Sequence, residues 1–473
     1  MPRILLLLPS STYRAADFLA AARDLGVEVV VASDAAFGNS TPATSTPTTS
    51  TPATSTPATS TPATGTPATS TPATSTPATS APATGPHPGS DADSGDRPVR
   101  SLVVDVDDPA ATALAIVELD RISPLDAVVA VDDRGIVAAA VAAERLGLPH
   151  AAPDAVVATR DKLRMRTALD SAEVPQPAFV AVDPADKAAA VHAAAQVGYP
   201  CVVKPTALST SRGVIRADGP EALAVAFRRA GAIARAAGEP HDRPLLVEQF
   251  VGGPEVAVEG VLRDGVLDVV AVFDKPDPLD GPYFEETIYI TPSRLDAADR
   301  RAVTATTSAA CRALGLRHGP VHAELRVSNG RANVIELAAR TVGGLCGRTI
   351  EIATGRRLET LVLANALGTA VPRAPRHRAA GVLMLPAPTA GRFAGVDGVD
   401  LALAVPGVTG VEITVTPGRY VAPAPDGARY VGFVFAKALT PAEAEAALRT
   451  AWARLDVHVD QASADDTELC APS

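Results

Sequence analysis

The chain has 473 residues, of which 47% are hydrophobic, and this length predicts about three domains with apolar cores. A formal net charge of −11 at pH 7 argues against nucleic-acid binding, so any site for a polyanion must be locally basic. The four cysteines (Cys201, Cys311, Cys346 and Cys470) lack a C-x-x-C spacing, which argues against a zinc knuckle or a disulfide framework and favours a reducing cytoplasm. No apolar stretch reaches the length of a membrane span, and we expect no membrane partner.

Residues 1–150 alternate between predicted strands and helices, apart from one insert, and this order predicts a parallel α/β sheet. The apolar run at 4–8 is too short for a signal-peptide core and is interpreted as a buried first strand. No G-x-G-x-x-G follows it, so dinucleotide binding is not supported. Asp132 and Asp133 stand at the carboxyl end of a parallel strand, where ligands tend to bind, although a solvated loop explains them equally well. The predicted strands are 4–8, 27–32, 102–106 and 127–131, and the predicted helices are 14–25, 110–121 and 134–146.

An insert at residues 38–100 interrupts this domain. Residues 41–85 are nine pentapeptides of the form T-P-A-T-S, without charge or large apolar side chains, and the polar run 86–100 extends them. Such a segment cannot bury enough surface to offset its chain entropy, so the pattern predicts an extended, mobile loop. A glycosylated stalk is one interpretation. A tolerated repeat expansion is favoured, because the segment falls between two strands of one domain and long surface insertions cost little stability.

Two lysines introduce the middle of the chain. Lys162 lies near the start of a predicted helix that Thr159 is placed to cap, and alone it indicates nothing specific. Lys204 ends a β-branched stretch, and a loop of small residues follows it, including Thr210 and Ser211. Backbone N–H groups in such a loop can approach phosphate oxygens while the lysine supplies positive charge. An ordinary hairpin loop is the alternative interpretation.

Residues 245–262 predict a strand, a glycine-containing turn and a second strand. Glu248 and Glu255 bracket the turn. Their carboxylates can accept hydrogen bonds from an adenine amino group and from ribose hydroxyls. Exposed charges on an edge strand are the alternative.

The most informative segment is a predicted β-hairpin, with strands at 322–327 and 333–340 and a turn at Asn329-Gly330. If the apolar faces of both strands pack on one core, Glu324, Glu336 and Arg340 share the opposite face, with His322 beside them. This arrangement requires an odd-length loop or a β-bulge. Two carboxylates on one face can hold Mg²⁺, and an adjacent arginine can clamp a phosphoryl or acyl-phosphate group. A surface salt bridge is the alternative, but the glycine-rich run at 342–347 favours a site.

The order of these motifs resembles the ATP-grasp superfamily over about residues 1–370. Within it, the E-L-A-A-R sequence at 336–340 and the loop after Lys204 resemble the L-amino-acid ligase branch, and 375–460 resembles the small C-terminal domain of that branch. The resemblance implies an α/β N-terminal domain at 1–150, an α+β ATP-grasp domain at 151–372 with a mobile lid at about 178–247, and an α+β domain at 373–460. Residues 461–473 are predicted to be a disordered tail.

The same resemblance implies the roles of individual residues. Arg340 would stabilise an acyl phosphate and a tetrahedral intermediate, while Glu324 and Glu336 would bind Mg²⁺ or Mn²⁺. Glu286 and His322 are candidate substrate contacts, Glu286 for an ammonium group, although a loop carboxylate is often only solvated. The residues assigned to ATP phosphates, adenine and ribose are Lys162, Lys204, Thr210, Ser211, Glu248, Gln249, Phe250, Val251 and Glu255.

The implied activity is an ATP-dependent ligase that activates a carboxylic acid as an acyl phosphate and couples it to an amine. One departure concerns the metal: many ATP-grasp enzymes have E-x-N-x-R, and Ala338 replaces the asparagine, which leaves open one or two metal ions. The chain also lacks the Q-V-E-H sequence of biotin carboxylases. The alternatives are an ATP-grasp carboxylase or purine-pathway ligase, a non-catalytic nucleotide-binding protein and, from the repeat alone, a secreted adhesin. Small-molecule substrates are the expected partners, and a homodimer is compatible with the sequence.

Overall fold

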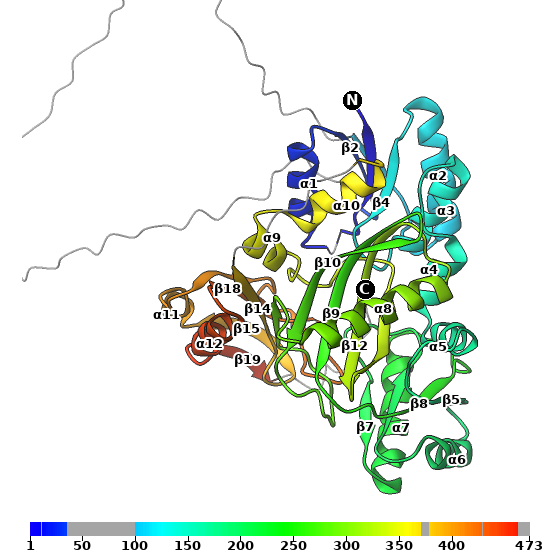
Figure 1. The fold of residues 1–473 in the computed structure, drawn as a ribbon, viewed down its shortest axis with the longest axis vertical. Helices are drawn as coiled ribbons and strands as arrows, with labels where there is room; N and C mark the ends of the chain where they lie inside the picture. The colour runs from blue at the N-terminus through cyan, green and yellow to red at the C-terminus, as the bar shows by residue number, and fades with distance from the viewer. Residues whose placement is uncertain (11, 36–99, 370–377, 428, 462–473) are drawn as a thin grey trace, which may run out of the picture. The chain divides into compact units, whose positions relative to one another are not determined.

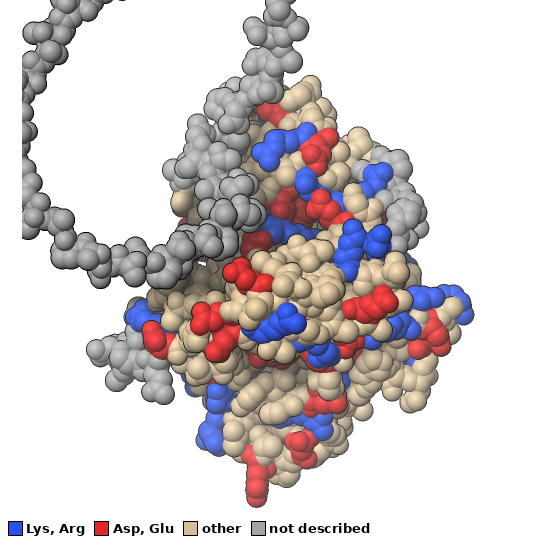
Figure 2. Space-filling view, turned by 90° about the vertical axis from the view of Figure 1, so that its left-hand side faces the viewer, with Lys and Arg blue, Asp and Glu red and all other residues tan. Residues whose placement is uncertain are grey.

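The computed structural model describes residues 1–10, 12–35, 100–369, 378–427 and 429–461 (Figure 1). The T-P-A-T-S repeat and the tail at 462–473 lie outside the described residues, so the predictions made for them stay predictions. None of the helices in the described ranges is long and apolar enough to cross a membrane. On the face shown in Figure 2, lysines and arginines are interspersed with acidic residues and do not gather into one basic patch.

The N-terminal segment forms the predicted parallel sheet, in the order β3-β2-β1-β4. Its first strand lies inside the sheet, and residues 4–8 are fully buried, as expected for a central strand of a parallel sheet covered on both faces. The elements are β1 (Arg3–Leu7), α1 (Ala15–Asp24), β2 (Glu28–Ser33), β3 (Arg100–Val103), α2 (Pro109–Ile122), β4 (Ala127–Ala130) and α3 (Ile136–Leu146).

A second, four-stranded antiparallel sheet has the order β5-β8-β6-β7 and its own apolar core beneath two helices. It corresponds to the stretch predicted as a lid and appears at the lower right of Figure 1. Two shorter helices precede it in the chain. The elements are α4 (Pro153–Arg160), α5 (Lys162–Ser171), β5 (Phe179–Val182), α6 (Lys187–Val197), β6 (Cys201–Pro205), β7 (Ile215–Ala217), α7 (Pro220–Ala236) and β8 (Leu245–Gln249).

The largest sheet has eight antiparallel strands in the order β13-β12-β9-β10-β11-β14-β18-β16. Strand β11 pairs with β14 over four residues, so the strands after residue 378 continue the sheet begun by the middle of the chain. Its elements, with the helices between them, are β9 (Glu255–Arg263), β10 (Val266–Lys275), β11 (Ile288–Thr291), α8 (Ala297–Ala313), β12 (Gly319–Ser328), β13 (Arg331–Ala338), α9 (Arg348–Thr354), α10 (Leu358–Ala366), β14 (Ala379–Leu385), β16 (Val408–Ile413) and β18 (Gly432–Ala438).

A three-stranded sheet in the order β17-β15-β19 completes the C-terminal part. Two helices from this part pack on the large sheet through a cluster of buried alanine, valine and leucine side chains. The predicted α+β character of this region is confirmed. The elements are β15 (Gly391–Asp397), α11 (Val399–Leu403), β17 (Tyr420–Val421), α12 (Pro441–Trp452) and β19 (Asp456–Gln461).

Candidate functional site

The hairpin β12–β13 brings the predicted acidic residues together. Asn329 and Gly330 at its turn have φ values of 53° and 73°, as a tight hairpin turn requires. The register shifts between the Glu324–Glu336 pair and the Leu325–Val334 pair, so the predicted bulge is present and Ile335 is the extra residue. Glu324 and Glu336 therefore lie directly opposite each other. Together with His322 and Arg340 they line a cavity of about 760 Å³.

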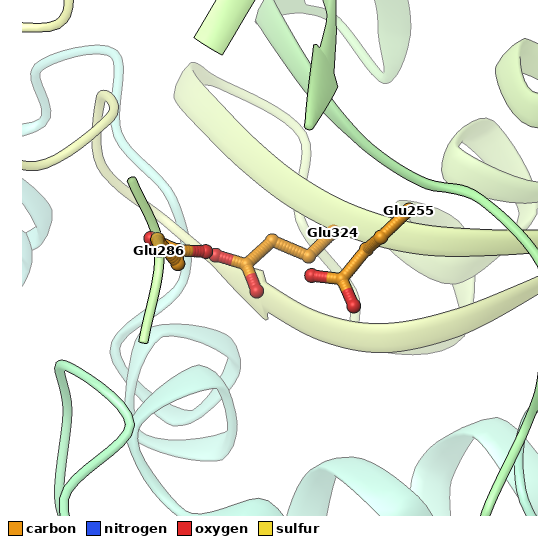
Figure 3. Close-up of side chains that lie close together, drawn as sticks. All are labelled: Glu255, Glu286 and Glu324. Atoms are coloured by element: carbon orange, nitrogen blue, oxygen red, sulfur yellow. The ribbon is translucent and has the colours of Figure 1, made fainter. Parts of the chain in front are cut away.

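A second carboxylate group forms around Glu324. Oxygen atoms of Glu255, Glu286 and Glu324 lie within 4.8 Å of one another, and the three side chains point toward a common centre (Figure 3). The Lys275 ammonium binds all three, at 2.7 Å from Glu255 and 3.3 Å from Glu324, and also contacts Glu286. Burial alone would lower the pKa of Lys275, but these carboxylates raise it well above its usual value. The group offers only oxygen ligands, which suits a hard cation such as Mg²⁺.

His322 lies between two carboxylates. Its Nδ1 contacts the fully buried Glu259, and its Nε2 lies 3.2 Å from Glu324. Burial favours the neutral ring, yet the two carboxylates raise the pKa of His322 to about 9. Burial likewise opposes the charge of Glu324, but Lys275 and His322 hold its pKa well below normal. The site thus holds an ionised glutamate between two cations.

Both predicted lysines lie at the site, where each contacts a different glutamate. The Lys162 ammonium lies 3.1 Å from Glu336 and donates to the Leu208 carbonyl at 2.7 Å. Lys204 lies 2.7 Å from Glu248. Burial, opposed in part by Glu248, lowers the pKa of Lys204 to about 8. The prediction that Thr159 caps the helix of Lys162 is wrong. Asp161 directly precedes α5 and caps it, because its side chain accepts hydrogen bonds from two backbone amides.

Arg166 is a buried residue of this site that the sequence reasoning missed. Its guanidinium is fully buried and lies 2.7 Å and 3.2 Å from the two oxygens of Glu248, and it also donates to the carbonyls of Val334 and Ile335. Burial opposes the charge of Glu248, but Arg166 and Lys204 lower its pKa to about 2. The position of Arg166, four residues after Lys162 on one helix face, was the available signal.

The predicted adenine segment lines a smaller pocket of about 70 Å³ beside these ion pairs. The Phe250 ring contacts two guanidinium groups, with its centroid 4.3 Å from Arg216 and 5.1 Å from Arg326. Arg326 also lies 2.9 Å from Glu255, which leaves that carboxylate bound on both oxygens. The predicted residues that line this pocket are Lys162, Lys204, Ser211, Glu248, Gln249, Phe250, Val251, Glu255, Glu286, Glu324 and Glu336.

The small-residue loop lies where the two cavities meet. Thr210 and Ser211 both have φ near 55°, and both line the larger cavity, while Ser211 also lines the smaller one. Next in this loop, the Gly213 amide donates to the Pro425 carbonyl at 2.9 Å, so the loop touches the C-terminal part of the chain.

Arg340 is held by the N-terminal segment. Its Nε donates to Asp133 at 2.8 Å, and this contact raises the pKa of Arg340 against the effect of burial. Arg14 donates to the Val131 carbonyl and to the hydroxyl of Thr341, the residue after Arg340. Of the two aspartates at the end of β4, Asp133 therefore reaches the site. Ala338 also lines the larger cavity.

Three family models match successive parts of the chain. An ATP-grasp N-terminal domain matches residues 87–150, an ATP-grasp domain matches 197–349, and an L-amino acid ligase C-terminal domain 2 matches 383–460. Among curated relatives, alanine–anticapsin ligase of Bacillus subtilis is 30% identical over 245 residues, which cover 48% of this chain and 51% of that protein. A D-alanine–D-alanine ligase of Alcanivorax borkumensis is 29% identical over 229 residues, which cover 46% of this chain and 68% of that protein.

The chain spans about half the length of the first of these relatives. Among solved structures, the L-amino acid ligase of Bacillus licheniformis superposes with a TM-score of 0.71 and 23% identity, covering 98% of this chain and 99% of that one, which shows a shared fold. Phosphoribosylglycinamide synthetase of Anaerococcus prevotii superposes with a TM-score of 0.62 and 13% identity, covering 97% and 100%. The chain belongs to the ATP-grasp superfamily, and its C-terminal domain is of the L-amino acid ligase type.

Proposed function

We propose that the protein is an ATP-dependent carboxylate–amine ligase, which joins an amino acid to an amine through an acyl phosphate and releases ADP and phosphate. The observation that carries the proposal is the meeting of two cavities. One is lined by Lys162 and Lys204, the other by Arg340, and both include Glu324 and Glu336. Phosphoryl transfer requires positioning and charge neutralisation, which this arrangement of lysines, carboxylates and arginine supplies.

We assign the base end of the nucleotide to the smaller pocket. Phe250 and Val251 give it an apolar wall, and the ammonium groups of Lys162 and Lys204 supply positive charge at its inner end. Relatives by fold include a biotin carboxylase domain solved with MgADP and a carboxyaminoimidazole ribonucleotide synthase solved with ATP, which supports this assignment. We assign the lid at about 178–247 to the covering of the phosphates, with Thr210 and Ser211 at its tip.

Glu324 and Glu336 are the proposed ligands of Mg²⁺, which when bound would neutralise the phosphates. Glu324 belongs both to this opposed pair and to the group with Glu255 and Glu286. Lys275 already contacts all three carboxylates of that second group. Glu336 is paired with Lys162 instead, so each carboxylate of the opposed pair also has a cationic partner. We assign one cation to this pair because its two carboxylates face each other across the hairpin, and Ala338 offers no further ligand.

The remaining residues orient the substrates. Arg340 aims a guanidinium into the larger cavity and would stabilise negative charge on the acyl phosphate and on the tetrahedral intermediate. Glu286 and His322 border the same space, where Glu286 can receive a substrate ammonium beside Lys275. An amine then attacks the activated carbonyl, the new carbon–nitrogen bond forms, and phosphate leaves.

The test is release of ADP and phosphate that depends on pairs of amino acids. Glu336→Gln and Arg340→Ala should abolish turnover while the far-UV circular dichroism stays unchanged. Each substitution removes a charged side chain that is proposed to act on the phosphoryl group, and neither changes the apolar core. Glu118→Gln, an exposed glutamate on α2, is the matched control and should keep full activity. Full activity in either site variant would contradict the assigned roles. Turnover with bicarbonate but not with amines would favour the carboxylase alternative, and no turnover with any pair would favour a nucleotide-binding protein.

A further inference from the structure

The larger cavity extends well beyond the reaction centre. Its volume of about 760 Å³ lies in the range of sites that hold a whole drug-sized ligand. One end carries Arg340 and the hairpin carboxylates. The walls include Tyr13 from the N-terminal segment and Thr416, Arg419 and Arg429 from the C-terminal part. The C-terminal domain therefore contributes to the space in which the substrates meet.

The charged residues that line this cavity pair almost completely. Arg134 lies 3.1 Å from Asp34, Glu336 lies 3.1 Å from Lys162, and Arg340 lies 2.8 Å from Asp133. Glu286 is bound by Lys275, and Glu324 by Lys275 and His322.

Arg419 and Arg429 are different. Both line the cavity, and neither guanidinium group makes a hydrogen bond or ion pair with another residue of the described ranges. The Thr416 hydroxyl, which also lines the cavity, has no hydrogen bond to a described residue either. The unmatched charge of the cavity is thus positive and comes from two guanidinium groups, which suit a carboxylate because each can donate two parallel hydrogen bonds.

The proposed reaction supplies such a carboxylate. Coupling two amino acids consumes the carboxylate of the donor, while the α-carboxylate of the acceptor stays ionised throughout and needs a counter-charge. Tyr13, Tyr430 and Met384 line the same cavity and give an apolar wall for the substrate side chains. The rings of Tyr13 and Tyr430 both pack against Phe433, with centroids at 6.0 Å and 6.4 Å, which fixes this wall.

We propose that Arg419 and Arg429 form a carboxylate subsite, which binds a substrate carboxylate other than the one that is activated. This rests on the proposed ligase function. The source is the α-carboxylate of the acceptor or an acidic side chain of either substrate, and both sources have the same chemistry. The subsite would make the C-terminal domain a determinant of acceptor choice.

The experiment compares an acceptor amino acid with its α-carboxamide, at saturating ATP and donor, in the wild type and in Arg419→Ala, Arg429→Ala and the double variant. The double variant should raise KM for the acid about tenfold to hundredfold, as expected for charge-assisted hydrogen bonds, with little change in kcat. KM for the amide should not change. Arg301→Ala, an exposed arginine on α8 that lines none of these cavities, is the matched control and should leave both values unchanged.

A second arm compares glutamate with glutamine as substrates. If the variants raise KM for glutamate alone, the subsite binds a side-chain carboxylate. If they raise KM for every acid and not for its α-amide, the subsite binds the α-carboxylate of the acceptor. Equal changes for acids and amides in both arms would overturn the subsite.

Calorimetric binding of the acid and the amide to the resting protein repeats the comparison without turnover. An absence of wild-type turnover with any pair counts against the proposed function. If the wild type turns over or binds the acid, and the double variant does so equally well, the result counts against the subsite alone.

Discussion

Replacing Glu248 with glutamine tests the buried ion cluster at the smaller pocket. The change leaves Arg166, which is fully buried, without its anionic partner, and Lys204 without the carboxylate with which it forms an ion pair. Removing one partner of a buried pair costs about 3–5 kcal/mol. The pKa of Glu248, lowered from 4.5 to about 2, independently corresponds to roughly 3 kcal/mol. We therefore expect Glu248→Gln to destabilise the protein by about 3–5 kcal/mol at pH 7.

The sign of the pH dependence follows from the direction of this shift. Because the folded state holds the pKa of Glu248 below its unfolded value, the carboxylate stabilises the fold fully above about pH 4.5 and loses this effect as pH falls toward 2. The stability difference between wild type and variant should therefore be constant from pH 7 to 5 and shrink below that. Glutamine does not titrate, so a decrease of this difference below pH 5 reports the protonation of Glu248.

The assay is reversible denaturation in guanidinium chloride without nucleotide, followed by circular dichroism at several pH values. Glu118→Gln, an exposed glutamate, is the control and should stay within about 0.5 kcal/mol of the wild type. A Glu248→Gln variant as stable as that control at pH 7, or a difference that grows as the pH falls, would refute the reasoning.

Two further predictions come from matched neighbours in the chain. Asp133→Ala should lower kcat by about tenfold or more with little change in fold, since the Arg340 guanidinium loses the carboxylate that orients it, whereas Asp132→Ala should have little effect. Steady-state ADP release measures both, and equal rates would rule out this positioning role. Gly253→Ala should cost about 1–3 kcal/mol, because Gly253 has a φ of +100° and an added Cβ would lie 2.2 Å from the Val327 carbonyl oxygen. Gly252→Ala, which meets nothing within 4 Å, should be nearly neutral in the same denaturation assay.

Local patterns were enough to predict much of the fold and the hairpin at its centre. Alternation along 322–327 and the Asn329-Gly330 turn determine which side chains face the core. The need to place Glu324 and Glu336 on one face implied an odd-length loop or a bulge, and the structure has the bulge. The parallel N-terminal sheet followed from the same kind of pattern. These features depend on neighbours a few residues apart.

The partners of the site residues were not predictable in this way. Lys275, Arg166 and Asp133 bind groups that are 49, 82 and 207 residues distant, and no local pattern marks such pairs. Thr159 was chosen as a helix cap although Asp161, nearer the first turn, is equally suited by residue type. The pairing of β11 with β14 across the boundary between two predicted domains was missed for the same reason.

That pairing determines which part of the molecule can move. The strands from β13 to β16 are hydrogen-bonded neighbours in one sheet, so the hairpin that carries Glu324 and the strands of the C-terminal domain belong to it, although β10 and β11 share only the Asp274–Ile290 pair. A swing of the C-terminal strands away from β11 would require the four paired positions between β11 and β14 to separate. The lid sheet has a separate core and shares no strand with this sheet. We therefore expect the lid to rotate when substrates enter and products leave, while the eight-stranded sheet keeps its arrangement.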